Sequence, residues 1–157
     1  MWLVLEDFNG DGYSDILWRS NSGQNVIWNM QGGSKIGDTG IFSNVPTDYQ
    51  VLSVADFNND GKADIFWRRS NGENVLWNMN NGSQLQNGND SIEFVGPEFA
   101  IAGTADFNGD GKMDILWRNT SGSNVIWNMN YNSTIKANTQ VGTTGNNLTQ
   151  VKGIFAK

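Results

Sequence analysis

Asp7-Phe-Asn-Gly-Asp-Gly-Tyr-Ser-Asp15 is an acidic, glycine-containing segment that recurs as Asp56-Phe-Asn-Asn-Asp-Gly-Lys-Ala-Asp64 and as Asp106-Phe-Asn-Gly-Asp-Gly-Lys-Met-Asp114. The copies begin 49 and 50 residues apart, and the 24-residue blocks 7–30, 56–79 and 106–129 share 15 identical positions. A fixed period of this length is typical of repeat proteins. The chain therefore divides into one repeat domain over 1–157, with repeats at about 1–49, 50–98 and 99–148.

The second repeat predicts four short strands joined by turns. Residues 50–55 and 63–68 flank the acidic segment and are rich in β-forming side chains. A glycine-containing turn over 70–73 leads to a third strand over 74–79, a polar loop over 80–89 and a weaker strand over 91–95. Four antiparallel strands in about 50 residues are typical of a propeller blade. We expect an all-β fold of three such blades, without helices, because Gly and Asn interrupt every apolar period of 3.6 residues.

The ends of the chain bear on how the blades assemble. Residues 149–157 repeat the first strand of a repeat, with Ala156 in place of the first Asp of the loop, and predict one extra strand. Closed propellers typically have four to eight blades. We therefore expect self-association of two copies into a six-bladed ring, and the alternative is that the chain is a piece of a longer polypeptide.

The acidic segments carry oxygen ligands at the spacing that calcium uses. Positions 1, 3, 5 and 9 are Asp, Asn, Asp and Asp, position 6 is a Gly that permits a sharp turn, and position 7 offers its carbonyl. Position 12 is Trp where an EF-hand has a bidentate Glu. The alternative is that these residues only form turns, but three complete copies favour about three calcium ions per chain. The predicted ligands are Asp7, Asn9, Asp11, Tyr13, Asp15, Asp56, Asn58, Asp60, Lys62, Asp64, Asp106, Asn108, Asp110, Lys112 and Asp114.

Composition excludes several classes of function. The net charge of −6 argues against a nucleic-acid surface, which needs a basic stripe. The absence of His and Cys excludes imidazole bases, thiolate metal sites and disulfides. No apolar run is long enough to span a bilayer, so membrane insertion is not expected.

The repeated Asp-Phe-Asn-Gly-Asp-Gly-x-x-Asp-Ile-x-Trp-Arg pattern resembles the FG-GAP/VCBS repeats of calcium-binding β-propellers, such as integrin α-subunit heads and propeller lectins. The resemblance covers essentially the whole chain. It implies a metal loop between the first and second strands of each blade and an extracellular or cell-surface location. The number of repeats departs from the family's closed rings.

Each repeat also carries Trp-Arg and Asn-Val-x-Trp-Asn, which allow two interpretations. Indole rings could stack on sugar rings while Arg and Asn bind hydroxyls, as the resemblance to propeller lectins implies; alternatively, Trp forms the core between blades, and Arg and Asn satisfy strand edges. The candidate ligand-binding residues are Trp18, Arg19, Asn25, Trp28, Asn29, Trp67, Arg68, Asn74, Trp77, Asn78, Trp117, Arg118, Asn124, Trp127 and Asn128.

Three functional hypotheses follow. The first is a calcium-stabilised lectin with glycans as ligands and repeated sites that give avidity. The second is an adhesion or self-assembly module that uses protein contacts and strand addition, with no sugar site. The third, an enzyme, is not expected, because we find no unrepeated group of acid, base and nucleophile in the sequence.

Overall fold

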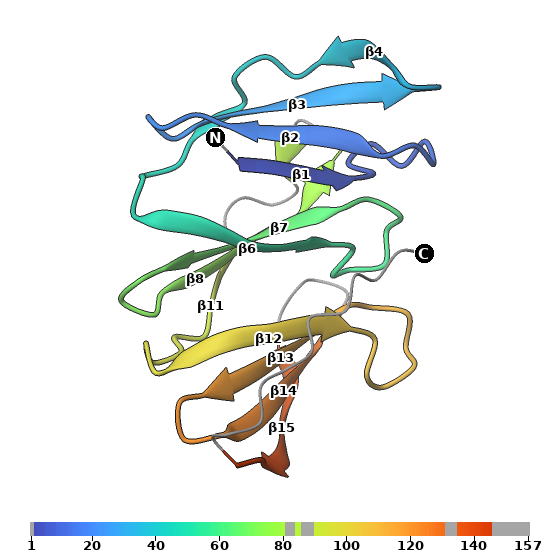
Figure 1. Ribbon diagram of the computed structural model, residues 1–157. Coiled ribbons are helices and arrows are strands. Elements are labelled where there is room, and N and C mark those ends of the chain that lie inside the picture. Colours follow the sequence, from blue (N-terminus) through green and yellow to red (C-terminus); the bar gives the residue numbers. More distant parts are fainter. Residues whose placement is uncertain (1, 81–83, 86–89, 131–134, 146–157) are drawn as a thin grey trace.

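A computed structural model describes residues 2–80, 84–85, 90–130 and 135–145. Within these residues every regular element is a β-strand, so there is no helix that could cross a membrane. Most strands form three antiparallel sheets that stack one on another (Figure 1), and two short strands form a separate two-stranded sheet. The predicted all-β fold with three blade-like sheets is therefore confirmed, although the described residues form no closed ring.

The first sheet contains β1 (Trp2–Glu6), β2 (Asp15–Arg19), β3 (Gln24–Gln31) and β4 (Ser34–Asp38) in that order. The short strand β5 (Ser43–Asn44) pairs with the beginning of β3, whereas β4 pairs with its end. The outer edge of this blade is therefore built from two separate pieces of chain.

The second sheet contains β6 (Tyr49–Ala55), β7 (Asp64–Arg69), β8 (Asn74–Trp77) and β11 (Asp90–Ile92). The first three strands lie within one or two residues of the predicted 50–55, 63–68 and 74–79, whereas the fourth ends at Ile92, before the predicted end at 95. The polar loop predicted from residue 80 is partly wrong, because β9 (Met79–Asn80) pairs with β10 (Gln84–Leu85). This pairing satisfies backbone groups that a loop would leave to water.

The third sheet contains β12 (Phe99–Ala105), β13 (Asp114–Asn119), β14 (Ser123–Met129) and β15 (Ile135–Thr143). Here one continuous strand, β15, pairs along the whole of β14. The extra strand predicted over 149–157 lies outside the described residues.

Two apolar clusters hold the stack together, one at each blade junction. Each cluster combines a Phe and two aliphatic or aromatic side chains from one blade with an Ile-Trp-Trp-Met set from the next. Ile27 faces the second blade, while Trp28 and Met30 lie on the opposite face of the first sheet, as the alternation in β3 predicts. Both faces of the middle sheet are covered, so Ile65, Phe66 and Leu76 are fully buried.

The turn between β7 and β8 supports the chain that connects the second blade to the third. Gly72 has a φ of 108°, and its carbonyl accepts a hydrogen bond of 3.1 Å from the Val95 amide. A Cβ atom at residue 72 would collide with the Val95 carbonyl oxygen. Only glycine therefore allows the turn and the connector to approach this closely.

We predict that Gly72→Ala lowers the free energy of unfolding by about 2–4 kcal/mol, because it adds a backbone clash to the left-handed strain. Gly33→Ala is the control, since Gly33 has a φ of 80° but no atom within 4 Å of an added Cβ. The control is expected to cost about 1 kcal/mol. Urea unfolding of both variants measures the difference, and equal losses would contradict the clash.

Candidate functional site

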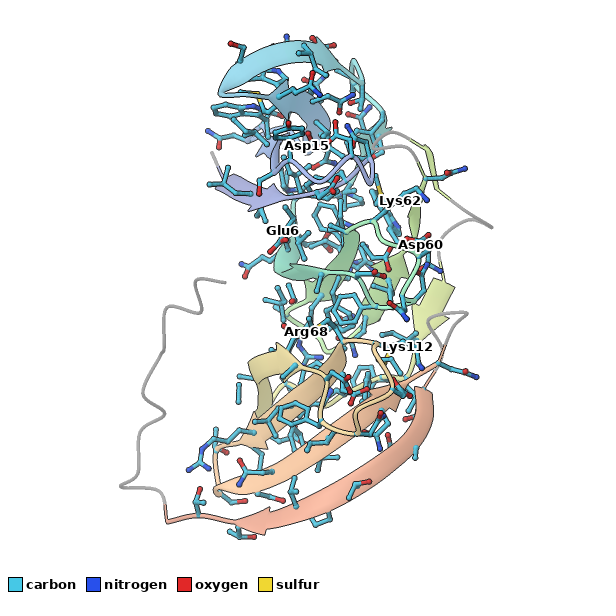
Figure 2. All side chains as sticks on the ribbon, turned by 90° about the vertical axis from the view of Figure 1, so that its right-hand side faces the viewer. Glu6, Asp15, Asp60, Lys62, Arg68 and Lys112 are labelled. Atoms are coloured by element: carbon cyan, nitrogen blue, oxygen red, sulfur yellow. The ribbon has the colours of Figure 1, made fainter. Side chains whose placement is uncertain are left out.

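The acidic segments form loops between the inner strand and the second strand of each blade. Figure 2 shows labelled side chains from these loops at successive levels of the stack: Asp15, then Asp60 with Lys62, then Lys112. The three candidate metal loops therefore follow one another along the same side of the molecule.

The first carboxylate of each loop organises the turn through backbone amides. The Asp7 carboxylate accepts hydrogen bonds of 2.7 Å from both Gly10 N and Gly12 N. The third loop repeats this geometry, and the N–H of Gly111 is the largest cause that lowers the pKa of Asp106. Two glycines at positive φ let the amides point inward.

Side chains at positions 3 and 5 cap the same turn. Asn9 Oδ1 accepts a hydrogen bond from Asp11 N, and Asp11 Oδ1 accepts one from Tyr13 N, both at 2.9 Å. Asn58 and Asp60 make the equivalent 2.9 Å contacts in the second loop. In the third loop, Asn108 Oδ1 accepts the Asp110 amide at 2.9 Å and Asp110 Oδ1 accepts the Lys112 amide at 3.1 Å.

The ninth position has a structural role that the sequence analysis missed. The carboxylates of Asp15, Asp64 and Asp114 are all fully buried. In the second blade, Asp64 Oδ2 accepts a hydrogen bond from Phe57 N and Oδ1 accepts one from Met79 N, at 3.1 and 2.9 Å. Each of these carboxylates thus ties its loop to the third strand of the same blade or, in the second blade, to β9, which follows that strand. The spacing of 15 residues between Asp and the Met of Val-x-Trp-Asn-Met could have revealed this pairing.

Burial and neighbouring carboxylates disfavour the ionised form at the ninth position of the first and second loops, so the pKa of each carboxylate is raised. Burial is the main cause that raises the pKa of Asp64 to about 7, and the charges of Asp60 and Asp56 raise it further. Burial followed by the charges of Asp11 and Asp7 likewise raises the pKa of Asp15. A cation in the loop would relieve this repulsion, since it favours the ionised carboxylates.

The donors of each loop fit calcium in kind, because all are oxygens and most are carboxylates. Among the described residues, however, no three acidic side chains converge at the spacing of metal ligands. Lysines partly neutralise two of the loops: Lys112 Nζ lies 2.8 Å from Asp110 Oδ2, and Lys62 Nζ lies 3.8 Å from Asp60 Oδ2. The first loop has the half-exposed Tyr13 in their place.

Successive loops are joined by backbone hydrogen bonds. Ala63 N donates to the Asp7 carbonyl at 2.7 Å, and Met113 N donates to the Asp56 carbonyl at 3.3 Å. The position of each loop therefore depends on its neighbour, and ordering one loop favours the ordered form of the next.

The arginine of each Trp-Arg motif holds the connection between blades. The Arg68 guanidinium is buried and donates to the carbonyls of Gly72, Val95, Gly96 and Phe99 and to Asn74 Oδ1, at 2.8–3.3 Å. Its Cζ lies 5.0 Å from the ring centroid of Trp117 in the next blade. Arg19 repeats this arrangement with Trp67 at 4.9 Å, and Arg118 bonds to Asn124 and to the carbonyls of Gly122 and Gly145.

The asparagines at the start of the third strands complete this network. Asn74 Nδ2 donates to the Glu93 carbonyl at 2.7 Å, and Asn25 and Asn124 make equivalent bonds to the outer strands. Of the asparagines after the second Trp, Asn78 is buried, whereas Asn29 and Asn128 are half-buried. The arginines of the Trp-Arg motifs and the asparagines at the start of the third strands thus contact mainly the protein's own backbone.

The tryptophans divide according to their blade. Trp67, Trp77, Trp117 and Trp127 are at most 5% exposed and lie in the junction cores, as the core interpretation predicts. Trp18 and Trp28 pack against each other at 4.8 Å on the outer face of the first blade and are partly exposed.

Small clefts open beside the junctions. At the first junction, Tyr49 borders an apolar cleft of about 120 Å³ with Trp67, Val75 and Trp77 and a second cleft of about 220 Å³. The second cleft is lined by the polar side chains of Ser20, Asn21, Thr47 and Gln50 together with Arg19 and Val51. The apolar cleft recurs at the second junction, around Phe99, with about 200 Å³.

One charged cluster belongs to the second blade alone. Arg69 lies 2.6 Å from Glu73 Oε2 and 2.9 Å from Asp48 Oδ2, and its guanidinium covers the Tyr49 ring. The ion pairs account for all of these charges, and the cluster adds no nucleophile.

We predict that Arg68→Lys lowers the free energy of unfolding by about 2–4 kcal/mol, because an ammonium cannot reach five acceptors and leaves buried carbonyls without donors. Arg69→Lys is the adjacent control; its ion pairs are partly exposed and contribute about 0–1 kcal/mol. Thermal and urea unfolding measure both variants. A loss for Arg68→Lys as small as that of the control would show that the hydrogen bonds of Arg68 to the connector do not stabilise the fold.

Comparison with known families agrees with the repeat structure. The model of the FG-GAP-like repeat matches residues 7–67 and 56–117, so each match spans two successive acidic loops and ends in the second strand of the later blade. A search of curated proteins found no match for the chain. On its repeat sequence and its three stacked blades, this chain belongs to the FG-GAP-like repeat family.

Proposed function

We propose that the chain is a calcium-stabilised, extracellular β-propeller-type module that binds carbohydrate beside its blade junctions. FG-GAP-like repeats form propeller-like modules that generally bind ligands rather than catalyse reactions. Calcium and carbohydrate are separate parts of the proposal, and different observations support them.

The calcium part is supported by charge and by repetition. Each loop places Asp, Asn, Asp and Asp around one glycine turn, and burial with neighbouring charge raises the pKa of Asp15 and Asp64. The loops lack the bidentate Glu of tight EF-hand sites. We therefore infer weak sites of the kind that fill at the calcium concentrations outside cells.

The carbohydrate part is carried by the paired clefts on either side of Tyr49. A sugar ring has an apolar face and polar edges, and here an apolar cleft adjoins one lined by hydroxyl and amide side chains. Thr47 and Gln50 are exposed, so they are accessible to a ligand. The clefts are smaller than typical drug-sized pockets, which fits a single sugar unit.

This proposal assigns the repeated arginines and asparagines a supporting role. Arg19 and Arg68 hold the connectors that form the cleft walls, because their guanidinium groups donate to the carbonyls of residues 45–49 and 95–99. Each site would bind weakly, and several sites on one scaffold would bind a glycan-coated surface more tightly.

We predict that calcium binds with about three ions per chain and that chelation lowers the melting temperature, because each occupied site stabilises the fold by about 2.7 kcal/mol at about 100 times its Kd. Asp60→Asn should remove about one ion from the stoichiometry. Asp38→Asn is the control, since Asp38 pairs with Lys35 outside the loops. Isothermal titration and calorimetry with EDTA test this, and no calcium uptake with an unchanged melting temperature would overturn it.

For carbohydrate, we predict that Gln50→Ala and Thr47→Ala each weaken binding to a glycan array by about tenfold, which corresponds to about 1.4 kcal/mol. Neither side chain is in an apolar cluster, so the melting temperature should stay the same. Gln31→Ala, at an exposed glutamine outside the clefts, is the control. Absence of binding by the wild-type chain, or full binding by both cleft variants, would disprove this part of the proposal.

A further inference from the structure

Both blade junctions are built from the same two half-surfaces. One half is the rear face of a blade, formed by the Phe after the first loop Asp and by one apolar residue from each of the next two strands. The other half is the front face of the following blade, an Ile, two Trp and a Met. Every one of these side chains is at most 5% exposed: Phe8, Leu17 and Ile27 with Ile65, Trp67, Trp77 and Met79, then Phe57, Phe66 and Leu76 with Ile115, Trp117, Trp127 and Met129.

The described residues leave one half-surface of each kind uncovered. The front face of the first blade carries Ile16, Trp18, Trp28 and Met30, all of which are partly exposed. The rear face of the third blade carries Phe107, Leu116 and Ile126. Phe107 is 44% exposed, whereas its equivalents Phe8 and Phe57 are fully buried, and Leu116 and Ile126 are also partly exposed.

We propose that a second copy of this chain covers both faces, with the rear face of its third blade against the front face of the first blade. The contact is head-to-tail because the two uncovered surfaces are the complementary halves of the junction found twice within the chain. Large apolar faces of this kind are the surfaces that soluble proteins cover with a partner.

The polar contacts of the internal junctions extend to this contact. Arg19 lies over Trp67 and Arg68 lies over Trp117, so the same geometry sets Arg118 against Trp18 of the second copy. The amides of Ala63 and Met113 donate to the preceding loop, so Ser14 N of the second copy would donate to the Asp106 carbonyl. The polar residues of the internal junctions therefore have sequence counterparts on both uncovered faces.

The stoichiometry follows from the number of blades. A head-to-tail contact closes into a ring or continues into a filament. Propellers typically close with four to eight blades, and six is the only multiple of three in that range. The inner strands β1, β6 and β12 lie side by side, which suits a common axis. For a chain of these three blades alone, a ring of six blades therefore takes two copies.

Light scattering and sedimentation of the 157-residue chain at micromolar concentration test the assembly. The expected mass is twice the 17.3 kDa of one chain. Met30→Glu on the front face and Ile126→Glu on the rear face should each yield a monomer. Ile36→Glu, at a side chain 58% exposed on β4, is the control and should remain a dimer. Circular dichroism and melting curves establish that every variant is folded.

A mixture of the two face variants separates head-to-tail contact from other associations. The Met30→Glu chain keeps an intact rear face and the Ile126→Glu chain keeps an intact front face, so mixing them should recover a dimer held by one unaltered junction. A monomeric wild-type chain, a dimeric Ile126→Glu chain, or a mixture without any dimer would each overturn the proposal.

Discussion

The structure depends on one constraint: each sheet has two apolar faces, and a sheet with two apolar faces must pack against a neighbour on both sides. Complete burial of one large apolar side chain contributes about 1.5–3 kcal/mol, and each junction buries seven. Exposed ion pairs such as Arg69 with Glu73 contribute about 0–1 kcal/mol. Burial between blades is therefore the dominant stabilising term. The same term underlies the proposal that a second copy covers the faces of the first and third blades that the described residues leave exposed.

The buried arginines provide hydrogen-bond donors for backbone carbonyls that become buried when the blades stack. Where one blade leads to the next, the connector passes close to the core and its carbonyls lose access to water. Arg19 and Arg68 donate to these carbonyls while their side chains pack on the next tryptophan. Burial lowers the pKa of both guanidinium groups, and the hydrogen bonds offset the cost of removing their charge from water.

The acidic loops combine a structural role with the proposed binding of cations. The buried carboxylate of Asp64 joins the loop to β9 through Met79 N, and the Asp56 carbonyl joins it to the next loop. A cation that neutralised one loop would act on a segment already connected to the blade core and to its neighbour. The stability of the stack and the charge state of the loops are therefore physically linked.

Local patterns in the sequence determined the blades. The period of about 50 residues, the alternation in β3 and the glycine turns specify short antiparallel strands, because these features depend on neighbouring residues. The oxygen donors of the loops were also evident from spacing alone. The repeat pattern could not show whether its Trp and Arg side chains pack in the core or bind a ligand, because both roles select the same side chains.

Only the tertiary structure decided which of these repeated side chains are buried and what they contact. Trp67 is buried because the second blade has a neighbour on its front face, whereas Trp18 has the same sequence context and is partly exposed. The Arg68 guanidinium donates hydrogen bonds to carbonyls 27–31 residues away, and the Asp64 carboxylate accepts one from an amide 15 residues away. The clefts beside Tyr49 likewise combine the first blade, the connector and the second blade. Such contacts arise only when separate blades stack, because burial depends on what covers a face and not on the residues that form it.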